Sequence, residues 1–192
     1  MKRFTVALTV LAICALFASN AFAQANVGLR GIGLKVGIVD PEDVDATLGV
    51  GLIMDMGTFH PNFAFETNVG WWSQGDEAYG TSYDVTDVSF GGRGKYLFQT
   101  SNPTLQPFVG AGLGLHVLSA HAETAPVYMG GTLIFPGYEA EDTEVRLGLD
   151  LGGGLKIDNG GQFAFVGEGW FSVVSDASHL SFMVGAVYMF GR

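Results

Sequence analysis

The stretch HLSFMVGAVYMF, from His179 to Phe190, decides the fold predicted for this chain. Every second residue from Leu180 onward is apolar (Leu, Phe, Val, Ala, Tyr, Phe), and serine, methionine, glycine and valine lie between them. Because successive side chains of a β-strand point to opposite faces, one face of this segment is wholly apolar and ends in two aromatic rings. The pattern predicts a terminal strand that closes a β-barrel in lipid.

The composition of the 192-residue chain excludes several other classes of protein. Glycine accounts for 29 residues and charged residues for only 15%, a combination that does not fit a soluble helical enzyme. The formal net charge of −10 argues against nucleic acid as a partner, because phosphate binding needs clusters of lysine and arginine. The single cysteine, Cys14, lies near the N-terminus, so we expect no disulfide and no thiol chemistry in the exported chain.

The first 23 residues have the pattern of a cleaved secretory signal. Two basic residues precede an apolar run from Phe4 to Ala18, and the motif Ala-Phe-Ala ends at Ala23. A lipoprotein site at Cys14 is the alternative, but bulky Ile13 and the short apolar run before it argue against that alternative. We therefore expect residues 1–23 to be the signal peptide and residues 24–192 to form one domain. No later stretch approaches the ~20 apolar residues of a membrane helix, so any membrane span must be made of strands.

Seven further segments alternate in the same way as the terminal stretch. They are residues 26–39, 47–56, 63–72, 86–98, 109–117, 145–157 and 163–172. The first segment begins out of phase, which indicates a bulge or irregular start. Together with the terminal stretch they give about eight strands, an even number, as single-chain bacterial barrels require. The predicted fold class is all-β, a transmembrane up-and-down antiparallel β-barrel.

The connections between these strands fall into two sets by length. Residues 57–62, 99–104 and 158–161 are short turns that meet at one end of the predicted barrel. Residues 73–84 and 119–143 are long, polar and acidic loops that meet at the other end. Short periplasmic turns opposite longer extracellular loops are typical of outer-membrane barrels. In the longest loop, the apolar patches 127–129 and 133–135 are expected to extend strands above the membrane.

Aromatic residues gather at the end of the predicted barrel that carries the short turns. We interpret them as half of an aromatic belt, because amphipathic rings favour the headgroup level of a bilayer. The residues of this predicted belt are Phe63, Phe65, Tyr96, Phe98, Phe163, Phe165, Tyr188 and Phe190.

The ionisable residues of the strands share a face with glycines and small polar residues. They are Glu66, Asp87, Arg93, Lys95, Arg146, Asp150, Lys156 and Glu168. In a soluble carrier barrel this face would be the wet exterior around an apolar ligand pocket. In a membrane barrel it would be a polar lumen in which the charges form an ion-pair network. The large aliphatic and aromatic residues of the opposite face favour the membrane barrel.

These features together resemble the small outer-membrane β-barrel families of OmpA/OmpX type. The resemblance covers the whole chain after the leader and depends on pattern rather than on a motif. It implies an outer-membrane location, contact with outer-membrane lipid and lipopolysaccharide, recognition of the last strand by the barrel-assembly machinery, and a monomer. The chain departs from the pattern in one place, because Gly191 and Arg192 follow the aromatic residue on which such barrels often end.

The function predicted from the sequence is that of a non-enzymatic outer-membrane barrel without a metal or cofactor. Its lumen is plugged by charges, and its acidic loops contribute to envelope integrity or to surface interaction. Two alternatives remain open: a barrel enzyme that acts on lipid A or phospholipid, and a narrow pore or channel for a small hydrophobic ligand.

Two pairs of lumen residues have specific expectations. The hairpin of the third and fourth strands brings Glu66 opposite the neighbourhood of Arg93, where an ion pair would serve as a plug or, alternatively, as a gate. Asp150 and Glu168 are expected to lie near each other across a later hairpin. Paired carboxylates can perform acid–base chemistry, but neutralisation by Arg146 or by a basic residue across the lumen is the preferred interpretation.

Two further patterns have a chemical interpretation beside a structural one. His179-Leu180-Ser181 resembles the His-x-Ser of the outer-membrane lipid A deacylases, in which a histidine activates a serine nucleophile. No carboxylate follows on the strand to orient the histidine, so a purely structural role is favoured. The loops also carry two acidic clusters that offer oxygen ligands for Ca²⁺ or Mg²⁺, although solvated loops are favoured. The clusters are Asp40, Glu42, Asp43 and Asp45, and Glu139, Glu141, Asp142 and Glu144.

Overall fold

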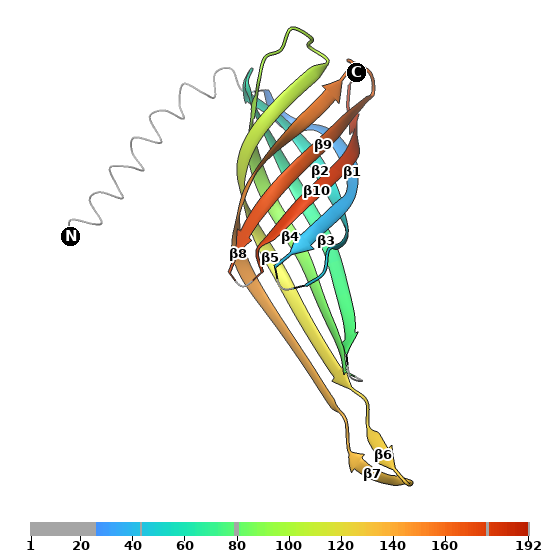
Figure 1. Cartoon of the computed structure of the whole chain (residues 1–192). Coiled ribbons are helices and arrows are strands. Elements are labelled where there is room, and N and C mark those ends of the chain that lie inside the picture. The colour runs from blue at the N-terminus through green and yellow to red at the C-terminus, as the bar shows by residue number, and fades with distance from the viewer. Residues whose placement is uncertain (1–25, 43, 79–80, 176, 192) are drawn as a thin grey trace, which may run out of the picture.

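Eight strands of the chain form a closed antiparallel barrel, and two short strands form a separate hairpin (Figure 1). The computed structural model describes residues 26–42, 44–78, 81–175 and 177–191, so the predicted signal peptide lies outside the described residues. The barrel strands are β1 (Asn26–Pro41), β2 (Thr47–His60), β3 (Phe63–Ala78), β4 (Thr81–Leu97), β5 (Leu105–Thr124), β8 (Tyr138–Asp158), β9 (Phe163–Val174) and β10 (His179–Met189). The hairpin consists of β6 (Val127–Met129) and β7 (Thr132–Phe135). No helix in the described part of the chain is long and apolar enough to cross a membrane.

The strands follow one another around the ring in chain order, and the ring closes between the first strand and the last. β10 pairs with β1 from Gly31 opposite Met189 to Pro41 opposite His179. Beyond this ladder the amide of Phe190 donates a hydrogen bond of 2.7 Å to the carbonyl oxygen of Arg30. The predicted fold class is therefore confirmed, and so is the irregular start of β1, where the register against β2 shifts between Val27 and Gly31.

The alternation of side chains separates an apolar exterior from a polar lumen. On β8, Leu149 and Leu151 are 43% and 47% exposed, whereas Asp150 between them is 3% exposed. The exposed leucines, valines and aromatic rings would be costly in water as one continuous surface, but they match the hydrocarbon of a bilayer. The face with the ionisable residues is thus the inside of the barrel.

Four strands continue well beyond the barrel as a sheet that we call the stalk. It consists of residues 73–86 of β3 and β4 and residues 118–124 and 138–144 of β5 and β8, with the β6–β7 hairpin, which we call the tip, at its far end (Figure 1). The pairing of β3 with β4 runs to Ala78 opposite Thr81, and the pairing of β5 with β8 runs to Thr124 opposite Tyr138.

The loops predicted at 73–84 and 119–143 are therefore mostly strand, and that prediction was wrong. The apolar patches near 127–135 pair with each other as the tip instead of extending the barrel strands. Beyond Val85, which packs against a buried cluster in the barrel, the stalk has solvent on both faces. Its residues therefore need not alternate between apolar and polar, and alternation was the signal used to predict strands. Ladder hydrogen bonds between long neighbouring strands keep the stalk ordered without that signal.

Glycines on the inner wall let large side chains cross the lumen. A Cβ atom on Gly112 would lie 2.7 Å from Cγ of Arg93, and one on Gly152 would lie 2.7 Å from Cε3 of Trp170. Such distances are well inside van der Waals contact, so larger residues at these positions would displace Arg93 and Trp170. The glycine content of the chain therefore makes room for the lumen side chains described next.

Candidate functional site in the barrel lumen

The centre of the lumen is an ion-pair network built around Glu168 of β9. The side chain of Glu168 is fully buried, and its carboxylate lies 2.7 Å from Nζ of Lys35 and 3.0 Å from Nζ of Lys95. Nη1 of Arg93 lies 3.6 Å from the same carboxylate. Lys35 comes from β1 and the other two cations from β4, so one carboxylate joins three strands around the ring. A charge this deeply buried is tolerable only because several cations surround it.

Two more carboxylates complete the central network. Glu66 accepts a hydrogen bond of 2.6 Å from Lys95, and Asp150 accepts one of 2.9 Å from Nε of Arg93. Ser172 donates a further hydrogen bond of 2.7 Å to Asp150. Each carboxylate of the network therefore receives at least one charge-assisted hydrogen bond, the stronger class of hydrogen bond in proteins.

Aromatic rings pack against two cations of the central network. The guanidinium carbon of Arg93 lies 4.2 Å from the centre of the Trp170 ring, and Nζ of Lys95 lies 4.2 Å from the centre of the Phe108 ring. Both distances are within the range of cation–π attraction. Trp170 is 1% exposed and Phe108 is 3% exposed, so these rings also fill the cross-section of the lumen.

A second polar layer lies between the central network and the stalk. Nδ1 of His116 is 2.8 Å from Oδ2 of Asp87, and both side chains are buried. The ring of His179 lies 5.6 Å from the His116 ring and 6.0 Å from the Trp72 ring, in edge-on arrangements. Three ring systems and a carboxylate thus close this side of the network.

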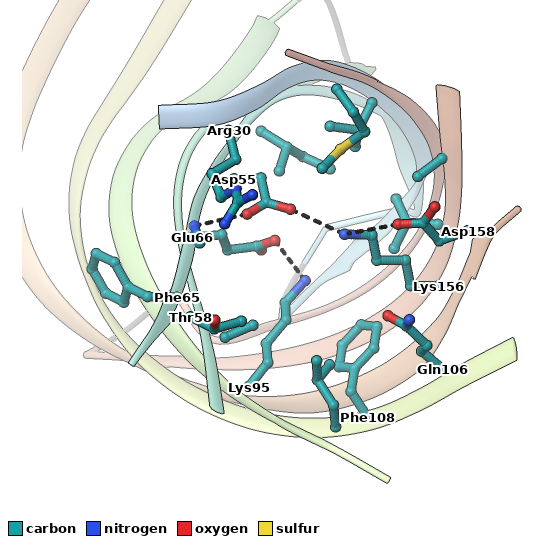
Figure 2. Close-up of a pocket in the computed structure, with 18 of the residues that line it drawn as sticks. Arg30, Asp55, Thr58, Phe65, Glu66, Lys95, Gln106, Phe108, Lys156 and Asp158 are labelled. Carbon is teal, nitrogen blue, oxygen red and sulfur yellow. Dashed lines mark hydrogen bonds and ion pairs between the residues drawn. The ribbon is translucent and has the colours of Figure 1, made fainter. Parts of the chain in front are cut away.

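A third layer lies toward the short-turn end of the barrel. Nζ of Lys156 lies 3.0 Å from Asp55 and 3.9 Å from Asp158, and the Lys156–Asp55 pair crosses the lumen from β8 to β2. The residues of this layer line a cavity of about 300 Å³ that lies between the central network and the short turns. Figure 2 shows its walls, with Asp55 and Glu66 on one side and Lys156 and Asp158 on the other.

The direct ion pair expected between Glu66 and Arg93 does not form. The two residues are opposite each other in the β3–β4 register, as predicted. However, Glu66 pairs with Lys95, which is two residues along the strand, and Arg93 reaches past Gly112 to Asp150. Lys95 thus pairs diagonally with the neighbouring strand β3, whereas Arg93 extends two strands away to β8.

Asp150 and Glu168 are linked through a cation and not through each other. In the β8–β9 register Asp150 faces Ser172, and Glu168 faces Gly154. Arg93 contacts both carboxylates, so the expected basic residue across the lumen is present. Arg146 is not that residue, because it pairs with Glu144 on its own strand and donates to the carbonyl oxygen of Ser175 near the stalk.

Three lumen residues with important contacts were not in the predicted network. Lys35, Asp55 and His116 each supply a partner to a predicted member. All three lie on the glycine-bearing face of their strands in the sequence. Alternation alone therefore placed all three in the lumen. In its predicted segment, each is the only ionisable residue on the lumen face.

His179 and Ser181 face the lumen and do not form a nucleophile pair. Nδ1 of His179 lies 3.3 Å from the carbonyl oxygen of Ala177, and Ser181 donates a 3.4 Å hydrogen bond to the carbonyl oxygen of Trp170. Both side chains are buried, at 8% and 7% exposure. A lipid outside the barrel cannot reach a serine on the inner wall, so this geometry does not support a lipid A deacylase.

The predicted aromatic belt residues lie at the short-turn end and on the outer surface. Phe63 packs edge-on against Tyr96, and Phe163 against Tyr188, with ring centres 5.1 and 5.5 Å apart. The neighbouring rings of Phe98 and Phe190 continue these two groups, which lie on opposite pairs of strands. Phe65 and Phe165 occupy the next outward positions on β3 and β9.

The acidic clusters of the connections do not form a metal site in the described part of the chain. No group of three or more His, Cys, Asp or Glu side chains there is arranged to hold a metal ion. Asp43, a member of the first predicted cluster, lies outside the described residues. Glu139, Glu141, Asp142 and Glu144 are exposed along β8 of the stalk.

Comparison with known proteins agrees with the architecture. The sequence profile of the outer membrane protein beta-barrel domain matches residues 8–190. The chain belongs to this outer-membrane β-barrel family. Its location is therefore the outer membrane, and its short-turn and stalk ends correspond to the two sides of that membrane. A search of curated proteins found no match.

Solved structures similar to this outer-membrane barrel share its fold at low sequence identity. Ail, the attachment invasion locus protein of Yersinia pestis, is 16% identical, with a TM-score of 0.57 over 85% of this chain and 99% of Ail. Neisserial surface protein A is 14% identical, with a TM-score of 0.57 over 83% and 96% of the two chains. A major outer membrane protein of Thermus thermophilus is 11% identical, with a TM-score of 0.59 over 83% and 99%.

Proposed function

We propose that this outer-membrane barrel is a non-enzymatic, closed scaffold that presents an acidic stalk and an apolar tip at the cell surface. The observation that carries the proposal is the contrast between the two parts of the molecule. The lumen charges contact one another inside the barrel, while the stalk charges other than Glu144, which pairs with Arg146, face solvent. In this assignment the short turns are periplasmic and the stalk is extracellular.

The packed lumen supports a closed barrel. An eight-stranded barrel has an interior just wide enough for side chains, and here Trp170, Arg93 and Phe108 occupy the middle of it. Ions would have to break charge-assisted hydrogen bonds around Glu168 to pass. A narrow pore is the second candidate, because the cavity near the short turns already opens one end of the lumen.

Planar bilayers separate the closed scaffold from the pore. We expect the wild-type barrel to give no discrete single-channel openings, and the double variant Arg93→Ala, Glu168→Ala to give them, because it removes the centre of the network while conserving net charge. Glu66→Ala combined with Arg93→Ala tests the plug first expected from the sequence and should also raise conductance. Discrete openings in the wild type would reject the plug.

The charge of the stalk supports a role in surface contact. Residues 73–86 and 118–144 contain eight acidic residues and no lysine or arginine: Asp76, Glu77, Asp84, Glu123, Glu139, Glu141, Asp142 and Glu144. Glu123 lies directly opposite Glu139 in the β5–β8 pairing. Like charges at such positions are destabilising, so a cationic partner would relieve a repulsion that is built into the sheet.

The tip adds apolar surface to this acidic stalk. Tyr128, Met129 and Ile134 are 65%, 71% and 61% exposed, and so are Leu133 and Phe135 of the tip and Tyr138 at the adjoining end of the stalk. Exposed apolar groups rimmed by charges are typical of protein interaction sites. We therefore infer that the partner is a protein with a cationic surface next to an apolar depression.

Ail offers a contrast in ligand charge. Ail of Yersinia pestis has been crystallised with the heparin analogue sucrose octasulfate, which is a polyanion. The acidic stalk of the present barrel would repel such a ligand. The proposal therefore predicts that this chain binds polycations and does not bind polyanions.

A binding measurement on the barrel in nanodiscs tests this proposal. An oligolysine peptide should bind, and binding should weaken as ionic strength rises above about 0.15 M, where exposed charges are screened over about 8 Å. A variant with Glu123, Glu139, Glu141 and Asp142 changed to their amides should lose the binding. A control with Asp40→Asn and Glu42→Gln, which removes two acidic charges outside the stalk, should bind normally. Binding of heparin in place of oligolysine would refute the proposal.

A further inference from the structure

The tip lies within a long uncharged stretch at the far end of the acidic stalk (Figure 1). Residues 124–138 contain no aspartate, glutamate, lysine, arginine or histidine, and Glu123 and Glu139 flank them on either side. These two glutamates are opposite each other in the β5–β8 pairing. The charged stalk therefore ends, and the uncharged segment begins, at one level of the sheet.

Apolar side chains project from both faces of the tip hairpin. Tyr128 is opposite Leu133 in the β6–β7 pairing, and Met129 is opposite Thr132. Because paired residues share a face and successive residues alternate, Tyr128 and Leu133 lie on one face, and Met129 lies on the other face with Ile134. The first two side chains are 65% and 49% exposed, and the second two are 71% and 61% exposed. Neither face of the hairpin is therefore covered by the described part of the chain.

An environment that surrounds the hairpin matches this arrangement more completely than a surface that covers one side. A depression on a protein contacts one face of a two-stranded hairpin and leaves much of the other face in water. The boundary between the headgroups and the acyl chains of a bilayer contacts both faces. Tyr128 and Tyr138 add amphipathic rings, which favour the headgroup level.

The backbone and the flanking charges limit the depth that the tip can reach. β6 and β7 form a two-stranded sheet, so each strand has one edge without a ladder partner in the described part of the chain. Unpaired amide and carbonyl groups are costly in the hydrocarbon core of a bilayer. Glu123 and Glu139 also oppose entry of the stalk behind the tip. The geometry thus favours the interface over the hydrocarbon core.

We propose that the tip inserts into the interfacial layer of a phospholipid bilayer that faces the cell surface, and that it prefers zwitterionic lipid. An anionic surface is disfavoured, because it repels the acidic stalk directly behind the tip. This inference goes beyond the proposed contact between the stalk and a cationic protein, and the two can be tested separately.

Sedimentation with sucrose-loaded vesicles tests the insertion. The intact barrel in nanodiscs should pellet with vesicles of phosphatidylcholine, while empty nanodiscs should stay in the supernatant. Binding to vesicles of phosphatidylcholine and phosphatidylglycerol in equal amounts should be weaker at low ionic strength, and the difference should shrink as salt screens the charges. Absence of the barrel from the phosphatidylcholine pellet, or tighter binding to the anionic vesicles, would overturn the proposal.

Substitutions in the tip identify the contact. Leu133→Ser combined with Ile134→Ser removes apolar area from both faces and should weaken vesicle binding by about tenfold or more. Tyr83→Ser removes an exposed ring from the stalk and should leave vesicle binding unchanged. Heat-modifiable gel mobility verifies that each variant is folded. Unchanged vesicle binding by the folded double variant would refute the proposal, whereas its binding of oligolysine should be normal, because the stalk charges are intact.

A fluorophore on the tip distinguishes insertion from contact with the vesicle surface. The chain has one cysteine, Cys14, which lies in the predicted leader, so Met129→Cys can be labelled selectively with an environment-sensitive dye. Its emission should shift to shorter wavelength when phosphatidylcholine vesicles are added. The same dye on Ala140→Cys in the stalk should show no shift. An unshifted dye at residue 129, or equal shifts at both positions, would overturn the insertion of the tip.

Discussion

The lumen and the stalk share strands and acidic residue types, but the carboxylates of the two regions have opposite surroundings. On β8, Asp150 is 3% exposed and bound to Arg93, while Asp142, eight residues earlier, is exposed on a stalk that has no lysine or arginine. Inside the barrel a carboxylate without a cation would be costly to bury. On the stalk, water solvates the carboxylate at little cost.

This difference indicates which charged residues stabilise the fold. The lumen network sits where water is scarce, so its members stabilise the barrel by satisfying one another. The stalk charges contribute little to stability and remain accessible to a partner. Paired substitutions, one in each region, can test this division, and the expected effects decrease in the order given below.

The largest effect is expected at Glu168. Glu168→Ala leaves Lys35, Lys95 and Arg93 with too few carboxylates in a buried site, and it should lower the free energy of unfolding by about 3–5 kcal/mol. Its counterpart in the stalk, Glu141→Ala, should change it by less than about 0.5 kcal/mol. Denaturant titrations in lipid vesicles measure both values. Similar losses in the two variants would contradict the division.

A charge on the outer wall should have the next largest effect. Leu151→Arg places a guanidinium at the middle of the lipid-facing surface, which should cost about 2–4 kcal/mol of folding free energy. Leu133→Arg adds the same group at the tip, where it meets water, and should be neutral within about 0.5 kcal/mol. The same unfolding assay applies. A stable Leu151→Arg variant would argue that this surface does not contact lipid.

A smaller effect is expected from a methyl group on the inner wall. A Cβ atom at Gly152 would lie 2.7 Å from the Trp170 ring and closer still to the Gly169 carbonyl oxygen, so Gly152→Ala should destabilise the barrel by about 1–3 kcal/mol. Gly167 on the neighbouring strand has no atom within 4 Å of such a Cβ. Gly167→Ala should therefore be close to neutral, and a loss equal to that of Gly152→Ala would be unexpected.

Removal of the tip should have the smallest effect on stability. Replacing residues 125–137 by Asn-Gly joins Thr124 to Tyr138, which already face each other across β5 and β8. We expect the barrel to keep its heat-modifiable mobility and its unfolding free energy within about 0.5 kcal/mol, and to lose affinity for the partner. A barrel that fails to assemble without the tip would show that the tip has a role in folding.

Much of the barrel could be predicted from the sequence because its two faces meet opposite environments. Leu149, Asp150 and Leu151 show this within three residues, and the same alternation marks every membrane segment. Stalk residues such as Gln74 and Asp84 lack it, since water surrounds both faces, and the strands there were mistaken for loops. Alternation also could not identify ion-pair partners. Lys95 rather than Arg93 binds Glu66, and Arg93 reaches Asp150 two strands away; which of these pairs form depends on side-chain length and on the stagger of the strands.

The meeting of β1 and β10 makes assembly a single event. Until the last dozen residues arrive, the growing sheet has two bare edges of unpaired amide and carbonyl groups, which are ready templates for aggregation. The pairing of Gly31 to Pro41 with β10 cannot form until residues about 150 positions later in the chain have been synthesised. Contacts over such a sequence separation are typical of slow folding. A chain that stops short of β10 is therefore left with an open sheet instead of a smaller cylinder, and whatever guides insertion must protect both margins until they join.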